Sequence, residues 1–446
     1  MFKKIELWIV GIIVLFFILL LLLSAGILRD AYLNKNQTPK FLRSNLMIAA
    51  EIPKNIYHII THIGGDINAP DKLQKHKNKK RFEQFVENKR NTLLVLPRYD
   101  HSLNRSVVDI VDLNNFEVIH TYKHDIDEMN NQVTNTKEFP KLKISNSPIR
   151  FPYQHPLLLE DGSLIGSAGG GLAYKIDFCS NLQWINDEEI FHHSQMLDHN
   201  GNIWVGGRMN PKSKYVKKYA IKNFADDSII KINTDGKILF NKSVSEILIE
   251  NNLVNENLFD QRHSDPIHLN DIEPAFTDTE YWKQGDVFLS PRHQSAIIHY
   301  RPSTNKVINY ITGPFAQQHD VDIISDKEIS IFNNNNFFVD NEYSEVVIYN
   351  FVTKKFRKLF NDQLQKENFK TVTRGLSHTF KDGSLMIEEQ NHGRIILFNN
   401  KGEKEWEFVN KDKNGDIGIL NSSRIIEDPL FIKKYKSLVE NKNNIS

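Results

Sequence analysis

The chain has 446 residues, of which 40% are hydrophobic and 25% charged, a composition typical of a folded protein and not of a disordered one. Its 56 lysines and arginines nearly balance 55 aspartates and glutamates, so the net charge of +1 excludes a general electrostatic attraction to nucleic acid, and we expect no nucleic-acid partner. The single cysteine, Cys179, excludes an intrachain disulfide framework and every metal or redox motif built from several cysteines.

The first predicted element is a membrane-spanning helix within residues 1–29. Residues 7–28 are uncharged and would form roughly 33 Å of helix, enough to cross a hydrocarbon core of about 30 Å. Lys3 and Lys4 precede this segment, so the positive-inside rule places the N-terminus in the cytoplasm and the rest of the chain outside it. A cleaved signal peptide ending near Ala25 is the alternative, although its apolar region would be long for a signal. Both predict a body in the bacterial periplasm, and the longer apolar segment favours a single-pass anchor in the inner membrane.

Residues 30–90 are predicted to be a helical linker next to the membrane. Apolar residues recur at roughly helical spacing over 41–63, and residues 73–90 are basic and helix-prone. Two interpretations of the basic stretch stay open. It either binds anionic lipid headgroups beside the anchor, or forms the solvated face of a helix that joins the membrane to the main domain.

Residues 91–425 have the pattern of an all-β domain. One unit recurs six times: an apolar run, a polar turn and a second run with bulky apolar residues, which predicts a β-hairpin. The six predicted hairpins begin at Ser106, Gly171, Ser228, Ala296, Glu345 and Gly393. Residues 426–446 are assigned to a C-terminal tail.

The spacing of the hairpins predicts a six-bladed β-propeller. The residues at the start of the six turns are Asp112, Asp177, Asn233, Arg301, Asn350 and Asn399, and successive turns lie 49 to 68 residues apart. These intervals leave room for two more strands beside each hairpin, and four antiparallel strands repeated radially are the signature of a propeller. A β-sandwich could also use hairpins, but six similar ones favour radial repetition.

A histidine precedes the other pair of strands in five of the six units. The five histidines are His155, His193, His268, His319 and His378. Residues at equivalent places in a radial repeat share one height and one radius. If that place is close to the axis, the five imidazoles converge on one central funnel.

Two other interpretations of the histidines are open. Repeated histidines can be architectural, but the residues around these five differ from unit to unit. A metal site is the second possibility, with Asp271 and Asp320 as the only adjoining carboxylates. Because neighbouring residues on a strand point to opposite faces, both carboxylates are expected to face away from the funnel. We therefore predict no metal and no other cofactor.

Neutral imidazoles together with Arg292 suit an anion with tetrahedral oxygens. A guanidinium matches two oxygens of a sulfate or phosphate group, and histidine donors can bind the remaining one. A neutral imidazole is also a nucleophile toward sulfur or phosphorus, and further histidines can transfer the protons.

Four segments resemble the bacterial arylsulfotransferase family, which works without a nucleotide sulfate donor. They are the HH segment from His192 to Ile203, HLN from His268 to Asn270, SPRHQSAI from Ser290 to Ile297, and QQHDVDIISDKEISIFNNN from Gln317 to Asn335. The segments occur in the family's order, and the broader resemblance covers residues 92–425.

The resemblance implies a six-bladed propeller that moves sulfate from an aryl sulfate donor to a phenol acceptor through a sulfohistidine, by ping-pong kinetics. It implies His319 as the nucleophile and Arg292 as the clamp on the sulfate, with His268 and His193 as acid–base groups or oxyanion donors. Asn270, beside His268, is the substrate-binding residue that the resemblance adds. His155 and His378 come from the repeat, and His293 adjoins Arg292; these three are also predicted to bind substrate.

The sequence departs from the family pattern at two points. Ser194 stands where the family has an acidic residue after the two histidines, and residues 332–335 read FNNN where the family has an FDNG-like turn. These departures support an alternative function, a non-catalytic propeller that binds a sulfated or phosphorylated ligand or a glycan. A hydrolase, in which water is the acceptor, is a third hypothesis.

Overall fold

The computed structural model describes residues 7–32, 39, 41–42, 45–46, 49, 70–87, 90–135, 147–219, 224–254, 258, 264–335 and 343–445. These residues belong to two compact units, Met1–Asn68 and Ala69–Ser446. In the first unit, helix α1 (Leu7–Tyr32) contains the segment Trp8–Leu28, which is apolar and long enough to cross a membrane. A membrane anchor and a signal sequence share these two properties.

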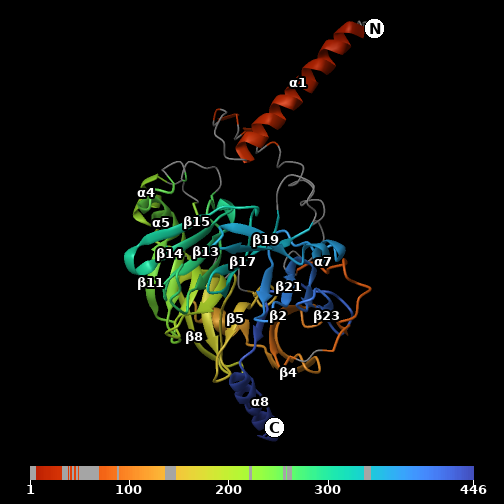
Figure 1. The fold of residues 1–446 in the computed structure, drawn as a ribbon, viewed down its shortest axis with the longest axis vertical. Helices are drawn as coiled ribbons and strands as arrows, with labels where there is room; N and C mark the ends of the chain where they lie inside the picture. Colours follow the sequence, from red (N-terminus) through yellow and green to blue (C-terminus); the bar gives the residue numbers. More distant parts are fainter. Residues whose placement is uncertain are drawn as a thin grey trace. The chain divides into compact units, whose positions relative to one another are not determined.

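The second unit is a β-propeller, which confirms the predicted class of fold. Its strands form five antiparallel sheets, and the colours in Figure 1 run once around this unit so that the last strands lie beside the first. One sheet contains β2 (Leu93–Asp100), β3 (Arg105–Asp112), β4 (Glu117–Tyr122) and β24 (Arg424–Ile426), and a second contains β12 (Leu269–Pro274), β13 (Val287–Pro291), β14 (Ile297–Arg301) and β15 (Lys306–Ile311). A third contains β16 (Val321–Ser325), β17 (Glu328–Asn333), β18 (Glu345–Asn350) and β19 (Lys355–Leu359). A fourth contains β1 (Phe82–Gln84), β20 (Leu376–Thr379), β21 (Leu385–Glu389), β22 (Arg394–Phe398) and β23 (Lys404–Val409).

The fifth sheet has seven strands because one long strand takes part in two sets of pairs. Its strands are β5 (Gln154–Leu158), β6 (Leu164–Ser167), β7 (Gly171–Ile176), β8 (Leu182–Leu197), β9 (Ile203–Arg208), β10 (Asp227–Ile232) and β11 (Ile238–Ser243). The first part of β8 pairs with β7, and its last part, from Ile190 to Leu197, pairs with β9.

Short helices connect the strands, and a longer helix follows the last one. They are α3 (Ile126–Asn131), α4 (Lys214–Tyr219), α5 (Val244–Glu250), α7 (Asn361–Lys366), α8 (Pro429–Ile445) and the 3-10 turns η2 (Arg292–Gln294), η3 (Pro302–Thr304) and η4 (Gln390–His392). The predicted C-terminal tail is thus largely the helix α8. Its Tyr435 is buried, and the Tyr435 hydroxyl lies 3.0 Å from that of Tyr122 on β4.

All six predicted hairpins are present. They are formed by β3–β4, β7–β8, β10–β11, β14–β15, β18–β19 and β22–β23. The polar residue that starts the turn explains five of them. Asp112, Asp177, Asn233, Asn350 and Asn399 each accept a backbone N–H from two residues further along, which closes the turn. The sixth turn starts at Arg301 and continues into η3, whose proline is preset for that conformation.

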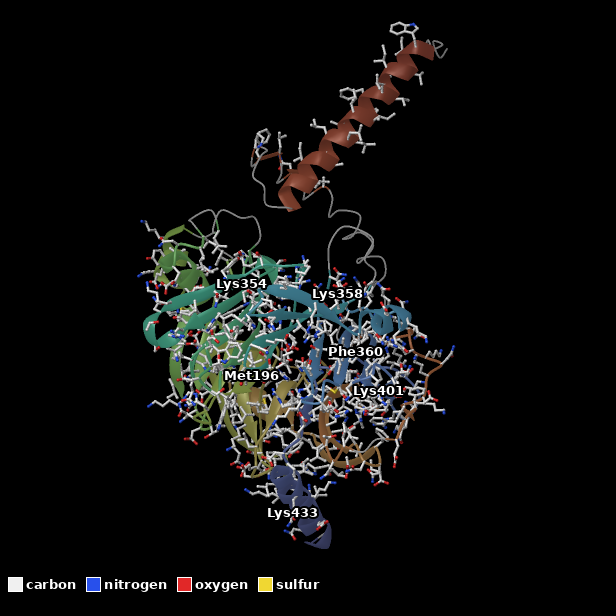
Figure 2. The ribbon with its side chains drawn as sticks, in the orientation of Figure 1. Met196, Lys354, Lys358, Phe360, Lys401 and Lys433 are labelled. Carbon is white, nitrogen blue, oxygen red and sulfur yellow. The ribbon has the colours of Figure 1, made fainter. Side chains whose placement is uncertain are left out.

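The ring is closed by strands from both ends of the second unit. β24 pairs with β2 in antiparallel register, with Leu93 opposite Ile426. Apolar side chains fill the space between adjacent sheets; one such cluster joins Trp204 and Ile229 to Leu289 and Ile298. Charged side chains such as Lys354 and Lys401 lie on the exposed turns (Figure 2).

The prediction of a helix over residues 73–90 is wrong for its described part. Here the chain forms turns and the strand β1, which pairs with β23, with Phe82 opposite Phe408. The basic residues bind the propeller itself: Lys75 and His76 contact the buried Glu389 at 2.5 and 2.9 Å. The basic, helix-prone composition predicted a helix, but acidic partners on β21 and β23 determine the conformation instead. Most of residues 33–69 lie outside the described part of the chain.

Candidate active site

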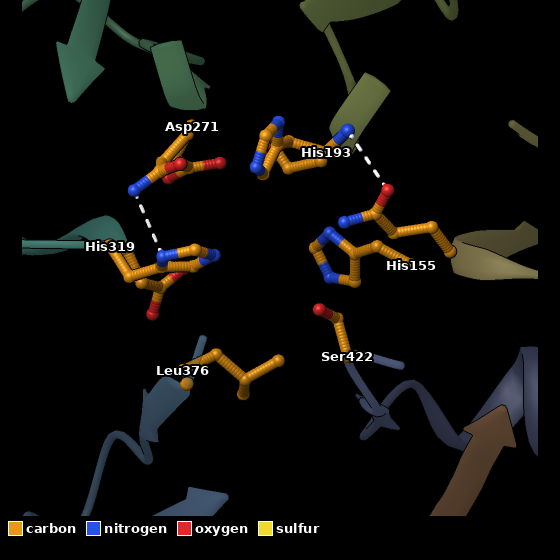
Figure 3. Close-up of a pocket in the computed structure, with 11 residues that line it drawn as sticks. His155, His193, Asp271, His319, Leu376 and Ser422 are labelled. Atoms are coloured by element: carbon orange, nitrogen blue, oxygen red, sulfur yellow. Dashed lines mark hydrogen bonds between the residues drawn. The ribbon is translucent and has the colours of Figure 1, made fainter. Parts of the chain in front are cut away.

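A cavity is lined by segments spread around the whole second unit (Figure 3). Its lining residues are Gln154 and His155 on β5, His193 and Ser194 on β8, Asn270 and Asp271 on β12, His319 and Asp320 before β16, Gly375 and Leu376 at the start of β20, and Ser422 before β24. Segments so far apart around a ring meet only near its axis. The cavity is therefore axial, and four of the predicted site residues, His155, His193, Asn270 and His319, line it together.

The strands that line the cavity are irregular where these residues lie. The register shifts between Gln154 and Leu157 on β5, between His192 and Gln195 on β8, and between Leu269 and Asp271 on β12. His319 and Asp320 together face Phe332, because the Phe332 carbonyl accepts from the His319 N–H and the Phe332 N–H donates to the Asp320 carbonyl. Each of the four irregularities is a β-bulge, the device that redirects side chains beside active sites.

The bulges overturn the prediction for Asp271 and Asp320, which both line the cavity instead of facing away. A bulge places two residues opposite one, so the alternation of faces on which the prediction depended is interrupted there. Burial raises the pKa of Asp271 to about 7, and the nearby Asp322 adds to the effect. Burial likewise raises the pKa of Asp320 well above its usual range.

The three histidines that line the cavity are held in the neutral form. Burial lowers the pKa values of His155, His193 and His319 well below the ordinary value for histidine, and nearby cationic groups lower them further. The His193 ring lies between two others, with ring centroids 5.6 Å from His319 and 5.4 Å from His268. Three imidazoles are therefore close enough to exchange protons through small movements.

Asn270 determines which nitrogen of His319 carries the proton. The Asn270 amide nitrogen donates to the Gln318 carbonyl at 3.0 Å and lies 2.9 Å from Nδ1 of His319. Because the same nitrogen is a donor in both contacts, Nδ1 is the acceptor and the neutral ring carries its proton on Nε2. The ring nitrogen that does not face Asn270 points into the cavity (Figure 3).

His268 and His293 lie beside the cavity and share one acidic neighbour that the sequence analysis missed. Nδ1 of His268 lies 2.7 Å from Oδ2 of Asp265, and Nδ1 of His293 lies 2.6 Å from the Asp265 carbonyl. Potential ligand atoms of Asp265, His268 and His293 come within 4.8 Å of one another, a grouping that can bind a divalent metal. In this structure Arg208 Nη2 approaches Oδ2 of Asp265 at 3.1 Å and places a positive charge at that position. The expectation of a metal-free site stays a prediction.

Two arginines act on His319 by charge. Both Arg292 and Arg374 contribute to the lowering of the His319 pKa, after burial. Arg292 donates to Oε1 of Gln317 at 2.8 Å and lies 2.9 Å from Nε2 of His293. Arg374 was missed by the sequence analysis; it is half-buried and donates to Oδ1 of Asn421 at 3.0 Å, next to the cavity-lining Gly375.

His378 does not line the cavity, contrary to the prediction. Its Nε2 lies 3.0 Å from Oε1 of Glu427, and its side chain is one-third exposed. The error is one of register. In the β5–β6 turn Gly162 donates to the Leu159 carbonyl, and in the β20–β21 turn Gly383 donates to that of Phe380. The residue four before Phe380, equivalent to His155, is Leu376, which does line the cavity.

The comparisons with known proteins agree with the resemblance noted from the motifs. A family model described as Arylsulfotransferase (ASST) matches residues 155–411, more than half of the chain. No protein of curated function matches the sequence.

Solved structures match this chain at low identity. A protein of unknown function from Bacteroides caccae is 10% identical, with a TM-score of 0.47 over 76% of this chain and 100% of its own. Virginiamycin B lyase from Staphylococcus aureus is 10% identical, with a TM-score of 0.38 over 73% of this chain and 87% of its own.

Proposed function

Because the chain belongs to the arylsulfotransferase family, we propose that it transfers sulfate from an aryl sulfate ester to a phenol or another hydroxyl acceptor, with His319 as the nucleophile. The observation that carries the proposal is the neutral, buried His319, whose ring is oriented by Asn270 with one nitrogen toward an axial cavity. An imidazole without charge and without solvent is the form that attacks sulfur.

In the first half-reaction the bond between Nε2 of His319 and sulfur forms while the bond between sulfur and the phenolic oxygen breaks. The N–H bond of Nε2 breaks as the N–S bond forms, because its electron pair becomes the bond to sulfur, and the proton moves to a neighbouring base. His193 is the neighbouring base, and His268 lies on its far side. The proton passes along these rings to the departing phenolate, so the products are the sulfohistidine and a neutral phenol.

The second half-reaction runs in the opposite sense. The acceptor oxygen forms a bond to sulfur, the S–N bond breaks, and the acceptor proton returns through the same rings to Nε2 of His319. The transferred group keeps its negative charge throughout, and we assign the holding of its oxygens to Arg292 and Arg374, whose charges act on His319. His155 and His293 complete the proposed substrate contacts from the side of β5 and from η2.

The test is the mass of the intact protein after incubation with p-nitrophenyl sulfate in the absence of acceptor. We expect a gain of one SO₃ group on His319, lost when a phenol is added. His319→Ala should abolish the gain, and His199→Ala, in the β8–β9 turn outside the cavity lining, should not. Donor binding without any adduct or turnover would favour the non-catalytic binding propeller, and adduct loss in water alone would favour a hydrolase.

We infer six blades and a single-pass membrane anchor. The blade count is supported by β8, since counting its two halves separately divides the seven-stranded sheet into two sets of four strands. The anchor is supported by the length and composition of Trp8–Leu28 and by the lysines before it, which favour a periplasmic propeller in a bacterial inner membrane. Protease protection in intact spheroplasts and the N-terminal mass of the membrane-bound protein test the two parts.

A further inference from the structure

Asp265 holds His268 by two hydrogen bonds. Its Oδ2 lies 2.7 Å from Nδ1 of the ring, and its Oδ1 accepts the backbone N–H of His268 at 3.1 Å. Since the carboxylate only accepts, Nδ1 carries the ring proton and Nε2 keeps its lone pair. One side chain therefore fixes the position, the orientation and the tautomer of this histidine.

The surroundings keep Asp265 ionised. Burial favours the protonated acid, but the hydrogen bond with His268 and the charge of Arg208 outweigh it, so the pKa of Asp265 lies well below its usual range. Arg208 in turn contacts Asp227 at 3.4 Å, which fixes the guanidinium. The carboxylate thus places a negative charge behind the His268 ring.

The free side of the ring lies next to the proposed proton path. The ring centroid of His268 is 5.4 Å from that of His193 and 4.7 Å from that of His293, and the His268 side chain is about a quarter exposed (27%). His268 therefore adjoins the buried ring of His193 and is also partly open to solvent.

We propose that Asp265 is a positioning residue that makes His268 the base for the incoming acceptor; this inference rests on the proposed sulfotransfer. In the second half-reaction the acceptor O–H bond breaks and its proton moves to Nε2 of His268. The O–S bond forms as the S–N bond to His319 breaks, and Asp265 faces the positive charge that His268 acquires. His268 then returns the proton by way of His193. In the first half-reaction the same ring gives a proton to the departing phenolate.

The experiment compares acceptors of increasing acidity in Asp265→Asn and in the unaltered full-length protein. An asparagine keeps the size of the side chain but removes the charge and adds an N–H donor beside the ring. We expect transfer to phenol to fall about 100-fold, because the base loses its orienting partner. Transfer to pentafluorophenol, which is already ionised at neutral pH, should fall less than threefold. Formation of the sulfohistidine from 2,4-dinitrophenyl sulfate, whose leaving group needs no proton, should also be nearly unchanged.

A matched control exists in the same sheet. Asp286 lies 2.9 Å from Nε2 of the buried His299 and does not line the cavity. Asp286→Asn should lower the unfolding temperature and leave the dependence on acceptor acidity as it is. His268→Gln should show the same selective loss as Asp265→Asn, and the double variant should be no slower than His268→Gln, because the two residues act as one unit.

Two results would overturn the inference: an equal loss for all acceptors in Asp265→Asn, or losses from the two single variants that multiply in the double variant. A failure of the proposed function is a different result, since the unaltered protein would then form no sulfohistidine with any donor.

Discussion

Protonation of Asp271 should control the affinity of the cavity for the sulfate donor. Asp271 lines the cavity, and burial raises its pKa to about 7. It is therefore neutral below pH 7 and negatively charged above it, whereas a sulfate ester is an anion at either pH. The charged groups that act on Asp271 are Asp322, which raises its pKa directly, and the neighbouring Glu273, Asp320 and Arg424, which belong to the same buried group.

The size of the effect follows from two magnitudes. Two like charges about 6 Å apart repel by roughly 3 kcal/mol at an effective dielectric constant of about 20, equivalent to more than a hundredfold in affinity. Protonating Asp271 at pH 8 costs much less free energy than this repulsion. With a pKa of about 7, Asp271 is already protonated in about one molecule in eleven at pH 8, and in about ten in eleven at pH 6. The donor therefore binds the protonated form, and its KM should rise about tenfold from pH 6 to pH 8.

The assay is the KM for p-nitrophenyl sulfate at pH 6 and pH 8, with product measured after an alkaline quench. Asp271→Asn should show the low KM at both values. Glu189→Gln is the control, because the pKa of Glu189 is also raised to about 7 by burial but its carboxylate contacts Asn210 and Asn241, away from the cavity. A KM that is equal at pH 6 and pH 8, or a tenfold rise that persists in Asp271→Asn, would refute this reasoning.

Three further outcomes are expected. His378→Ala should retain the rate of sulfate transfer and lose less than about 1 kcal/mol of unfolding free energy, because its contact with Glu427 is partly exposed, whereas His155→Ala should slow transfer; initial rates and thermal unfolding measure both. Arg374→Gln should raise the KM for the donor about tenfold, the typical weight of a charge-assisted hydrogen bond, and a KM unchanged from that of the unaltered protein would remove Arg374 from the anion site. Gly375→Ala should destabilise the fold by about 2 kcal/mol or more in urea unfolding, because Gly375 has a φ of +129° and a Cβ there would lie 2.4 Å from the Phe332 ring.

The parts of the fold that were predictable are those that local interactions determine. Each hairpin depends on an alternating pattern and on one polar residue at its turn, and both are visible in the sequence. The place of β1 depends on Glu389 and Glu407, more than 300 residues away along the chain, and on the free edge of β23. The local sequence of a basic segment does not indicate that its partners lie so far away along the chain.

The candidate site was predictable to the extent that the repeat is regular. His155, His193 and His319 meet because equivalent places in the repeat share one radius. The prediction for His378 is wrong because the equivalent place lies two residues earlier, at Leu376. The direction of Asp271 was not predictable, since a β-bulge has no reliable sequence signal and reverses the faces that alternation assigns. Asp265 was missed because it lies outside the repeat, although an acid three residues before a candidate histidine is a signal that a search for histidine partners would find.

The backbone at the site is strained at three histidines. Each of them is held in its strained conformation by a hydrogen bond to another residue. His155, His193 and His268 have φ values of 43°, 61° and 51°, in the left-handed region that costs a residue other than glycine about 1–3 kcal/mol. In each case the N–H of the strained residue donates to a separate group: the Asn421 carbonyl at 2.8 Å, Oε1 of Gln154 at 3.2 Å and Oδ1 of Asp265 at 3.1 Å respectively. These bonds use the backbone and not the imidazole, so alanine at these positions should keep the bulges in place. A loss of activity in the alanine variants is then due to the missing imidazole ring. Glycine variants relieve the backbone strain, so they should be at least as stable as the alanine variants.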